Sequence, residues 1–136
     1  MSIQGGCLCG KVRYEIASAL QSADHCHCSM CRRQHGAAFA TYADFKPTDF
    51  HWVSGEECIT IFEPSPDGGW CFCRECGSSL AGTLDGDIVT IALGTVEGDP
   101  GVKPSFHIFV DSKASWDVIS DELPQFGARP NEDEVP

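Results

Sequence analysis

The sequence has few basic residues and no long apolar run. No segment approaches the roughly 18–20 consecutive apolar residues of a membrane helix. The opening stretch, MSIQGGCLCGKVRYE, lacks the basic-then-apolar layout of a secretory signal. Nine Lys and Arg stand against 20 Asp and Glu, a formal charge of −11, and such a surface repels phosphate backbones and anionic headgroups. We therefore expect a cytoplasmic protein that binds neither nucleic acid nor a membrane.

With 136 residues, the chain has no room for two globular domains of ordinary size. Its hydrophobic content of 42% excludes a disordered chain, and 14 Gly and 8 Pro indicate many turns between short elements. The last segment, GARPNEDEVP, is polar and net negative. We expect a single zinc-binding domain over residues 1–126, followed by a flexible acidic tail over residues 127–136.

Short strand-like runs dominate the sequence. Alternating or β-branched residues occur at 11–16, 37–42, 58–63, 78–83, 88–93 and 106–110. Turn sequences separate these runs, most clearly PSPDGG at 64–69 and LDGD at 84–87. One short helical turn is expected at 29–35, ended by Gly36. The pattern predicts a mainly β, antiparallel fold with little helix.

The nine cysteines are the most distinctive feature of the sequence. An odd number of cysteines without a secretory signal argues against a disulfide framework. Eight of them fall into three groups: Cys7 and Cys9; Cys26, Cys28 and Cys31; Cys71, Cys73 and Cys76. Cysteines one or two residues apart can turn their sulfurs toward one ion, but they rarely meet disulfide geometry with each other. The spacing therefore predicts zinc binding; reduced cysteines packed as small hydrophobes would explain burial but not the grouping.

Eight clustered cysteines fit two zinc sites, with one cysteine left over. A structural zinc takes four protein ligands, whereas a catalytic zinc takes three and keeps a position open. One division gives a closed site of Cys7, Cys9, Cys73 and Cys76. The remaining group, Cys26, Cys28 and Cys31, then forms an open site where chemistry can occur.

The cysteine groups belong to longer motifs that, together with motifs toward the C-terminus, occur in one known family. These motifs are GCLCG at 6–10, HCHCSMCR at 25–32, FCRECG at 72–77, PSFHIFV at 104–110, SKA at 112–114 and LPQF at 123–126. In this order, over about residues 5–126, they resemble the glutathione-dependent formaldehyde-activating enzymes and the wider group that includes centromere protein V-like domains. The resemblance implies a β-tent fold, in which antiparallel sheets fold over a structural zinc.

The resemblance also implies two zinc ions per chain, divided in the same way as above. The structural ion would be held by Cys7, Cys9, Cys73 and Cys76, and the catalytic ion by Cys26, Cys28 and Cys31. Cys71 departs from the family pattern and would either compete for the structural zinc or lie buried as an idle thiol. Cys58 stands alone in a strand-like run and is expected in the core.

The reaction implied by the resemblance joins glutathione reversibly to formaldehyde and gives S-hydroxymethylglutathione. A free thiol is only a few per cent ionised at pH 7, and zinc would hold the entering sulfur as a thiolate. Glutathione brings carboxylates to an acidic protein, so Arg32 and Arg33 are candidates to bind them, with solvated surface arginines as the alternative. His25 and His27 are candidate proton donors or partners of the metal ligands, or else packing residues.

Two functions fit this sequence. The first is a zinc-dependent carbon–sulfur lyase that acts on glutathione or a similar thiol and on formaldehyde or another small electrophile. The second is a non-catalytic interaction module with two zinc ions. The open three-cysteine site favours the enzyme, because a structural site is normally closed. The sequence does not determine which thiol and electrophile react, or the oligomeric state.

Overall fold

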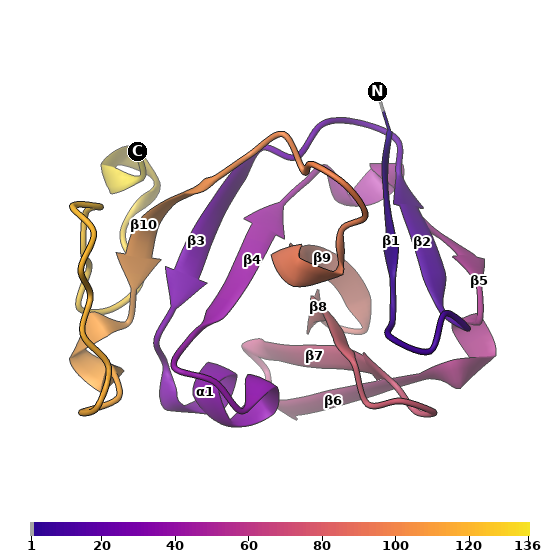
Figure 1. The fold of residues 1–136 in the computed structure, drawn as a ribbon, viewed down its shortest axis with the longest axis horizontal. Coiled ribbons are helices and arrows are strands. Elements are labelled where there is room, and N and C mark those ends of the chain that lie inside the picture. The colour runs from indigo at the N-terminus through magenta and orange to yellow at the C-terminus, as the bar shows by residue number, and fades with distance from the viewer. Residues whose placement is uncertain (1) are drawn as a thin grey trace.

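The computed structural model describes residues 2–136, which form mainly short strands (Figure 1). The strands of this part of the chain are β1 (Ile3–Gly6), β2 (Arg13–Ile16), β3 (Ser22–Cys26), β4 (Ala40–Asp44), β5 (Phe50–Ser54), β6 (Ile59–Ser65), β7 (Gly68–Cys73), β8 (Ser79–Leu84), β9 (Asp87–Ala92) and β10 (Pro104–Ile108). The helical elements are α1 (Ser29–His35) and the 3-10 turns η1 (Pro47–Asp49), η2 (Glu56–Cys58), η3 (Leu93–Thr95), η4 (Val110–Ser112) and η5 (Glu132–Glu134). The prediction of a mainly β fold with little helix is confirmed. Among residues 2–136, no helix combines the length and the apolar character needed to cross a membrane.

The strands form two open sheets. The smaller sheet has the order β1-β2-β5, and the larger one has the order β10-β3-β4-β9-β8-β7-β6. The larger sheet twists strongly, so that β3 and β4 run steeply across the direction of β7 and β6 (Figure 1). This twist lets one face of the sheet curve around a cavity, which is described below.

One strand pair differs from the predicted antiparallel arrangement. β10 lies parallel to β3, with His107 opposite His25, whereas the other strand pairs in the described chain are antiparallel. A parallel neighbour needs a long connection instead of a hairpin, and β10 is separated from β3 by residues 27–103. Strand runs in a sequence do not reveal this direction, because it depends on the path of the connection.

The hairpin predicted at 84–87 is present between β8 and β9. Asp85 and Gly86 both have a positive φ, 50° and 80°, as the tight turn of a two-residue hairpin requires. The sequence analysis did not identify β1, β3, β5 or β7 as strands, and the first two residues of β7, Gly68 and Gly69, lie in the turn predicted at 64–69. In β3 the apolar alternation is interrupted by Asp24 and His25, which lie on the faces that form the candidate site.

The main core lies between the two sheets. Val12, Tyr14 and Ile16 are fully buried, as the alternation at 11–16 predicts, and they share a cluster with Leu80 and Ile91 of the larger sheet. A second apolar cluster surrounds one of the cysteine groups and consists of Cys26, Cys31, Ala40, Trp70, Phe106 and Ile108. Burial of the main core holds the two sheets together, whereas the second cluster packs α1 and β10 against the rest of the larger sheet.

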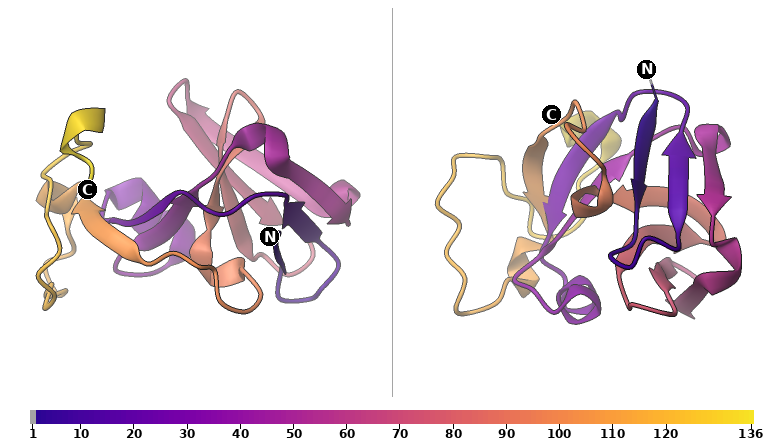
Figure 2. Two further views of the ribbon diagram at one scale, coloured as in Figure 1. Left: turned by 90° about the horizontal axis from the view of Figure 1, so that it is seen from above. Right: turned by 45° about the vertical axis from the view of Figure 1, so that its right-hand side comes forward.

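The segment after β10 folds back along that strand (Figure 2). The N–H of His107 donates to the carbonyl of Pro124, and the N–H of Phe126 donates to the carbonyl of His107, both over 2.9 Å. Further along, the N–H of Phe109 donates to the carbonyl of Ala128. Residues 131–134 close into η5, which has a capping box. The flexibility expected for residues 127–136 stays a prediction.

Candidate metal centres and the adjoining cavity

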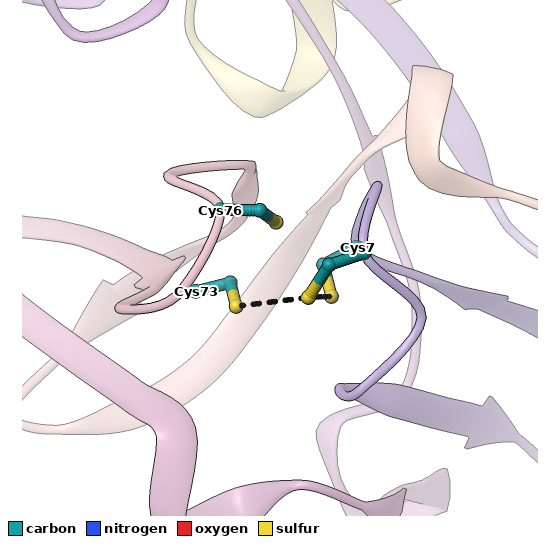
Figure 3. Close-up of side chains that lie close together, drawn as sticks. Cys7, Cys73 and Cys76 are labelled. Atoms are coloured by element: carbon teal, nitrogen blue, oxygen red, sulfur yellow. Dashed lines mark hydrogen bonds between the residues drawn. The ribbon is translucent and has the colours of Figure 1, made fainter.

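Four thiols from two distant segments meet beside the smaller sheet. The segment after β1 contributes Cys7 and Cys9, and the end of β7 with its following turn contributes Cys73 and Cys76. The four sulfurs lie within 4.8 Å of one another, with Cys7 and Cys9 Sγ 3.5 Å apart. In Figure 3, Cys73 and Cys76 face Cys7 across the gap between the two segments.

Local turns direct these sulfurs toward one point. Gly10 and Gly77 follow the cysteine pairs with φ of 82° and 79°, a left-handed conformation that glycine adopts without strain. The N–H of Gly77 donates to the carbonyl of Cys73 over 2.7 Å and closes the second turn. Hydrogen bonds from the Ser78 hydroxyl and from backbone N–H groups lower the pKa of Cys76 to about 5. A thiol with this pKa is a thiolate at neutral pH, the form that binds metal.

Three further thiols meet where β3 leads into α1. Cys26 ends β3, Cys28 is the N-cap of α1, and Cys31 lies in its first turn; their sulfurs also lie within 4.8 Å of one another. The N–H of Cys31 donates to Cys28 Sγ over 3.3 Å. The thiols of Cys26 and Cys31, together with backbone N–H groups at the start of α1, hold the pKa of Cys28 far below its ordinary value.

The donor chemistry of both clusters fits zinc. Four sulfurs placed about 2.3 Å from a tetrahedral zinc would be about 3.8 Å from one another. Two Sγ–Sγ distances in the four-thiol cluster, 3.5 Å for Cys7 with Cys9 and 3.9 Å for Cys9 with Cys73, bracket this value. Four thiols make a closed set, whereas the cluster of Cys26, Cys28 and Cys31 leaves a fourth position for another ligand.

The two other cysteines lie outside both clusters. Cys71 is fully buried in β7, and burial, with a contribution from Cys73, raises its pKa to about 12. Cys58 is buried in the main core. Both thiols therefore have the environment of small apolar side chains packed in the interior.

A cavity of about 840 Å³ borders the three-thiol cluster. Its floor is one face of the larger sheet, because alternate residues of neighbouring strands share a face. The strand register gives the facing pairs of this floor: Asp24 with Tyr42, Asp44 with Thr90, Thr90 with Gly82, and Gly82 with Trp70. Cys26 lies two residues after Asp24 on the same strand and so faces the cavity as well. The cavity is therefore large enough and well placed to admit a peptide-sized thiol to the cluster.

The cavity carries more acidic than basic groups. Asp24, Asp44, Asp67 and Glu132 line it, and Arg129 is the single Lys or Arg in its lining. Burial, and secondarily the nearby Asp44 carboxylate, raises the pKa of Asp24 to about 7, and the charge of Arg129 acts in the opposite direction. Strand alternation, counted two residues back from Cys26, would have placed Asp24 on the same face as that cysteine. No local signal in the sequence indicates that Arg129 lines the cavity.

The opposite face of β3 carries a buried histidine chain. His27 Nε2 lies 2.8 Å from His107 Nδ1, and His107 Nε2 lies 3.0 Å from a carboxylate oxygen of Asp121. Because the carboxylate only accepts, His107 in its neutral form donates from Nε2 and accepts at Nδ1 from His27. His25, beside them, contacts Thr41 Oγ1 through Nδ1 over 2.8 Å. The chain braces the segment that carries Cys26 and Cys28, and sequence reasoning missed Asp121.

The predicted substrate-binding arginines lie on α1. Arg32 is half-buried, and its Nε is buried with no hydrogen-bond partner within residues 2–136. Arg33 is exposed. Neither residue belongs to the lining of the cavity.

Comparison with known proteins gives one consistent family. Residues 2–112 match the model of the family described as glutathione-dependent formaldehyde-activating enzyme. A protein of Halomonas elongata that is provisionally named a glutathione-dependent formaldehyde-activating enzyme is 26% identical over 126 residues, which cover 85% of this chain and 80% of the relative. A crystal structure of a Rhodobacter sphaeroides protein is similar at 28% identity with a TM-score of 0.56, over 71% of this chain and 89% of that one.

Proposed function

Because the chain belongs to the glutathione-dependent formaldehyde-activating enzyme family, we propose that it is a zinc-dependent carbon–sulfur lyase that joins glutathione reversibly to formaldehyde. The observation that carries this proposal is the three-thiol cluster of Cys26, Cys28 and Cys31 at the border of a large cavity. In the cytoplasm, where we propose that the reaction takes place, these thiols would stay reduced.

The reaction needs a thiolate, an electrophile held near it, and a proton for the product oxygen. Zinc on the cluster, when bound, supplies the Lewis acidity that holds the substrate sulfur as thiolate at neutral pH. Met30, Trp70 and Phe106 line the cavity with apolar surface and keep water away from that sulfur. The sulfur forms a bond to the carbonyl carbon of formaldehyde, the carbonyl π bond breaks, and the oxygen takes up a proton.

Tyr42 is the residue we assign as the donor of that proton. It faces the cavity, and its hydroxyl lies 2.6 Å from His35 Nε2. Burial, with the negative charge of the nearby thiolates, raises the pKa of Tyr42, so the phenol stays protonated at neutral pH. When His35 donates from Nε2, the O–H of Tyr42 is free to point to the substrate oxygen, and the same contact stabilises the phenolate left after transfer.

The proposal also gives a role to the two arginines of α1. Arg32 and Arg33 follow the three-thiol cluster directly in the sequence. We propose that they offset the negative charge that the thiolates and the carboxylates of glutathione bring to this acidic protein. The half-buried guanidinium of Arg32 is the closer of the two to the interior.

Native mass spectrometry with and without glutathione tests the proposal, because it counts metal and ligand in one spectrum. We expect two zinc ions in the wild type, one in Cys28→Ser, and a glutathione adduct only in the wild type. Cys71→Ser is the matched control, since Cys71 lies outside both clusters and should keep two zinc ions. One zinc ion in the wild type, with no adduct and no change in Cys28→Ser, would leave the interaction module as the function.

Catalysis itself needs a second measurement, because thiols add to formaldehyde without an enzyme. Exchange of formaldehyde between its free and glutathione-bound forms can be followed by NMR at equilibrium. The zinc-loaded protein should accelerate the exchange in proportion to its concentration, and Cys28→Ser should return it to the background rate. Equal exchange rates for the two proteins would contradict the enzyme.

A further inference from the structure

The cavity beside the three-thiol cluster has a wall that lies outside the family match. Its floor belongs to the larger sheet, within the matched residues 2–112, whereas Arg129, Pro130, Glu132 and Val135 come from the C-terminal segment. Figure 2 shows this segment beside β10, on the far side of the molecule from β1. The family match therefore does not describe the chemistry of this wall.

Arg129 is held in place at this wall. Its guanidinium lies 5.6 Å from the centroid of the Phe109 ring, at the distance of a cation–π contact. Two backbone hydrogen bonds fix the chain just before it, from the N–H of Phe109 to the carbonyl of Ala128 and from the N–H of Asp111 to the carbonyl of Gly127. Phe109 itself has a left-handed backbone conformation, with φ 56°, which is rare for an aromatic residue and sets the direction of its ring.

The guanidinium of Arg129 has no partner of opposite charge in the described chain. Within residues 2–136, no carboxylate lies within 4.0 Å of it, and it makes no hydrogen bond to another side chain or to the backbone. Its donors are therefore available to a ligand in the cavity. A guanidinium binds a carboxylate through two parallel N–H···O bonds, a geometry that an ammonium group does not offer.

The other charges in the cavity limit where an anionic ligand can bind. Asp24, Asp44, Asp67 and Glu132 oppose a single guanidinium, which gives the lining a formal charge of −3. A ligand carboxylate is repelled everywhere except at Arg129, whereas a ligand ammonium is attracted by the acidic side chains. A thiol with an amino-acid group, which carries both charges, fits this arrangement better than a purely anionic thiol does.

We propose that Arg129 binds the carboxylate of an amino-acid thiol whose sulfur reaches the cluster of Cys26, Cys28 and Cys31. This inference rests on the proposed function, because it names the residue that selects the thiol at the same site. Glutathione satisfies it through its γ-glutamyl group, which carries a carboxylate and an ammonium. The C-terminal segment thereby acts as the part of the chain that determines substrate specificity.

Calorimetric titration of the zinc-loaded full chain with four thiols tests the assignment. Glutathione and γ-glutamylcysteine carry the amino-acid carboxylate of the γ-glutamyl group, whereas cysteamine and 2-mercaptoethanol carry no carboxylate. In Arg129→Gln, the Kd of the first two should rise at least tenfold, and the Kd of the second two should stay within threefold of the wild type. Arg129→Lys should recover only part of the lost affinity, because it restores the charge without the paired donors.

Lys46→Gln is the matched control, because it removes one positive charge at an exposed position outside the cavity lining. Its Kd for all four thiols should stay within twofold of the wild type. A circular dichroism spectrum and zinc count equal to those of the wild type establish that each variant is folded and loaded. An equal effect of Arg129→Gln on all four thiols, or no effect on glutathione, would overturn the assignment while the proposed function stands. Absence of binding by every thiol to the wild type would overturn both.

Discussion

Cys9 and Cys73 are 64 residues apart in the sequence, yet their Sγ atoms lie 3.9 Å from each other. The contact ties the segment after β1 to the end of β7, and so connects the smaller sheet to the larger one. A metal ion shared by these thiols would close a long loop, which stabilises the folded chain because the unfolded chain loses conformational freedom.

Removing a thiol of this cluster should therefore lower stability. We expect Cys73→Ser to bind one zinc ion fewer and to lose on the order of 5 kcal/mol of unfolding free energy, because the structural metal contributes directly to folding. Urea unfolding together with elemental analysis measures both quantities. Cys71→Ala, two residues away on the same strand, should keep the zinc content of the wild type. Equal zinc content in Cys73→Ser and Cys71→Ala would exclude Cys73 as a ligand.

Tyr42→Phe should slow the proposed reaction without preventing thiol binding. The variant keeps the ring but loses the hydroxyl that lies 2.6 Å from His35 Nε2. We expect at least a tenfold lower kcat for formaldehyde exchange and a Kd for glutathione within threefold, because general-acid catalysis contributes about 10² or more. Tyr14→Phe, in the main core, is the control and should keep the wild-type kcat. An unchanged kcat in Tyr42→Phe would show that the proton comes from elsewhere.

His107→Ala should destabilise the fold by about 2–3 kcal/mol. The substitution leaves the fully buried His27 without the partner that now lies 2.8 Å from its Nε2, and an unsatisfied buried polar group is costly. Chemical denaturation measures the loss. His51→Ala serves as the comparison, since its side chain is largely exposed, and it should change the unfolding free energy by less than about 0.5 kcal/mol. A similar effect of both substitutions would show that the buried histidine chain contributes no stability.

Gly5→Ala should destabilise the junction of the two sheets. A Cβ at this position would come within 2.3 Å of both the Tyr14 hydroxyl and the Thr95 carbonyl oxygen, and the carbonyl belongs to the backbone. We expect a loss of about 1–3 kcal/mol, as for other substitutions that overpack a core. Gly94→Ala is matched to it, because a Cβ there meets no atom within 4 Å. At equal zinc content, Gly5→Ala should unfold at a clearly lower temperature than Gly94→Ala. Coincident unfolding curves would contradict the close packing around Gly5.

Stability should decline at high pH because of Tyr14. Burial raises its pKa from 10 to about 12, so the unfolded chain ionises this tyrosine before the folded chain does. The stability that results from this pKa difference is fully present below pH 10 and is lost as the pH rises through 12. The loss amounts to about 2–3 kcal/mol of unfolding free energy. The difference in unfolding free energy between wild type and Tyr14→Phe should therefore decrease across this window. A constant difference from pH 9 to pH 12 would contradict the burial effect.

Local sequence predicted the features that depend on neighbouring residues. Alternation at 11–16 predicted the buried face of β2, and the Asp85–Gly86 pair predicted the turn between β8 and β9, because strand periodicity and a positive φ are properties of a few consecutive residues. The cysteine spacing likewise indicated that thiols close in sequence gather, since C-x-C and C-x-x-C segments turn their sulfurs to one side, whereas the union of Cys7 and Cys9 with Cys73 and Cys76 was one of the divisions that the spacing allowed and the one that the family resemblance implied. Zinc ligation by these thiols stays a prediction.

Tertiary structure alone decided the features that join distant segments. The parallel direction of β10, the contact between His27 and His107, and the place of Arg129 in the cavity all depend on how the chain after β9 returns to β3. No local pattern specifies that path, because it is selected by the burial of whole strand faces and by hydrogen bonds between segments that are about 80 residues or more apart. The sequence by itself determined a β protein with grouped thiols suited to metal ions, whereas the fold decided which side chains surround the cluster of Cys26, Cys28 and Cys31.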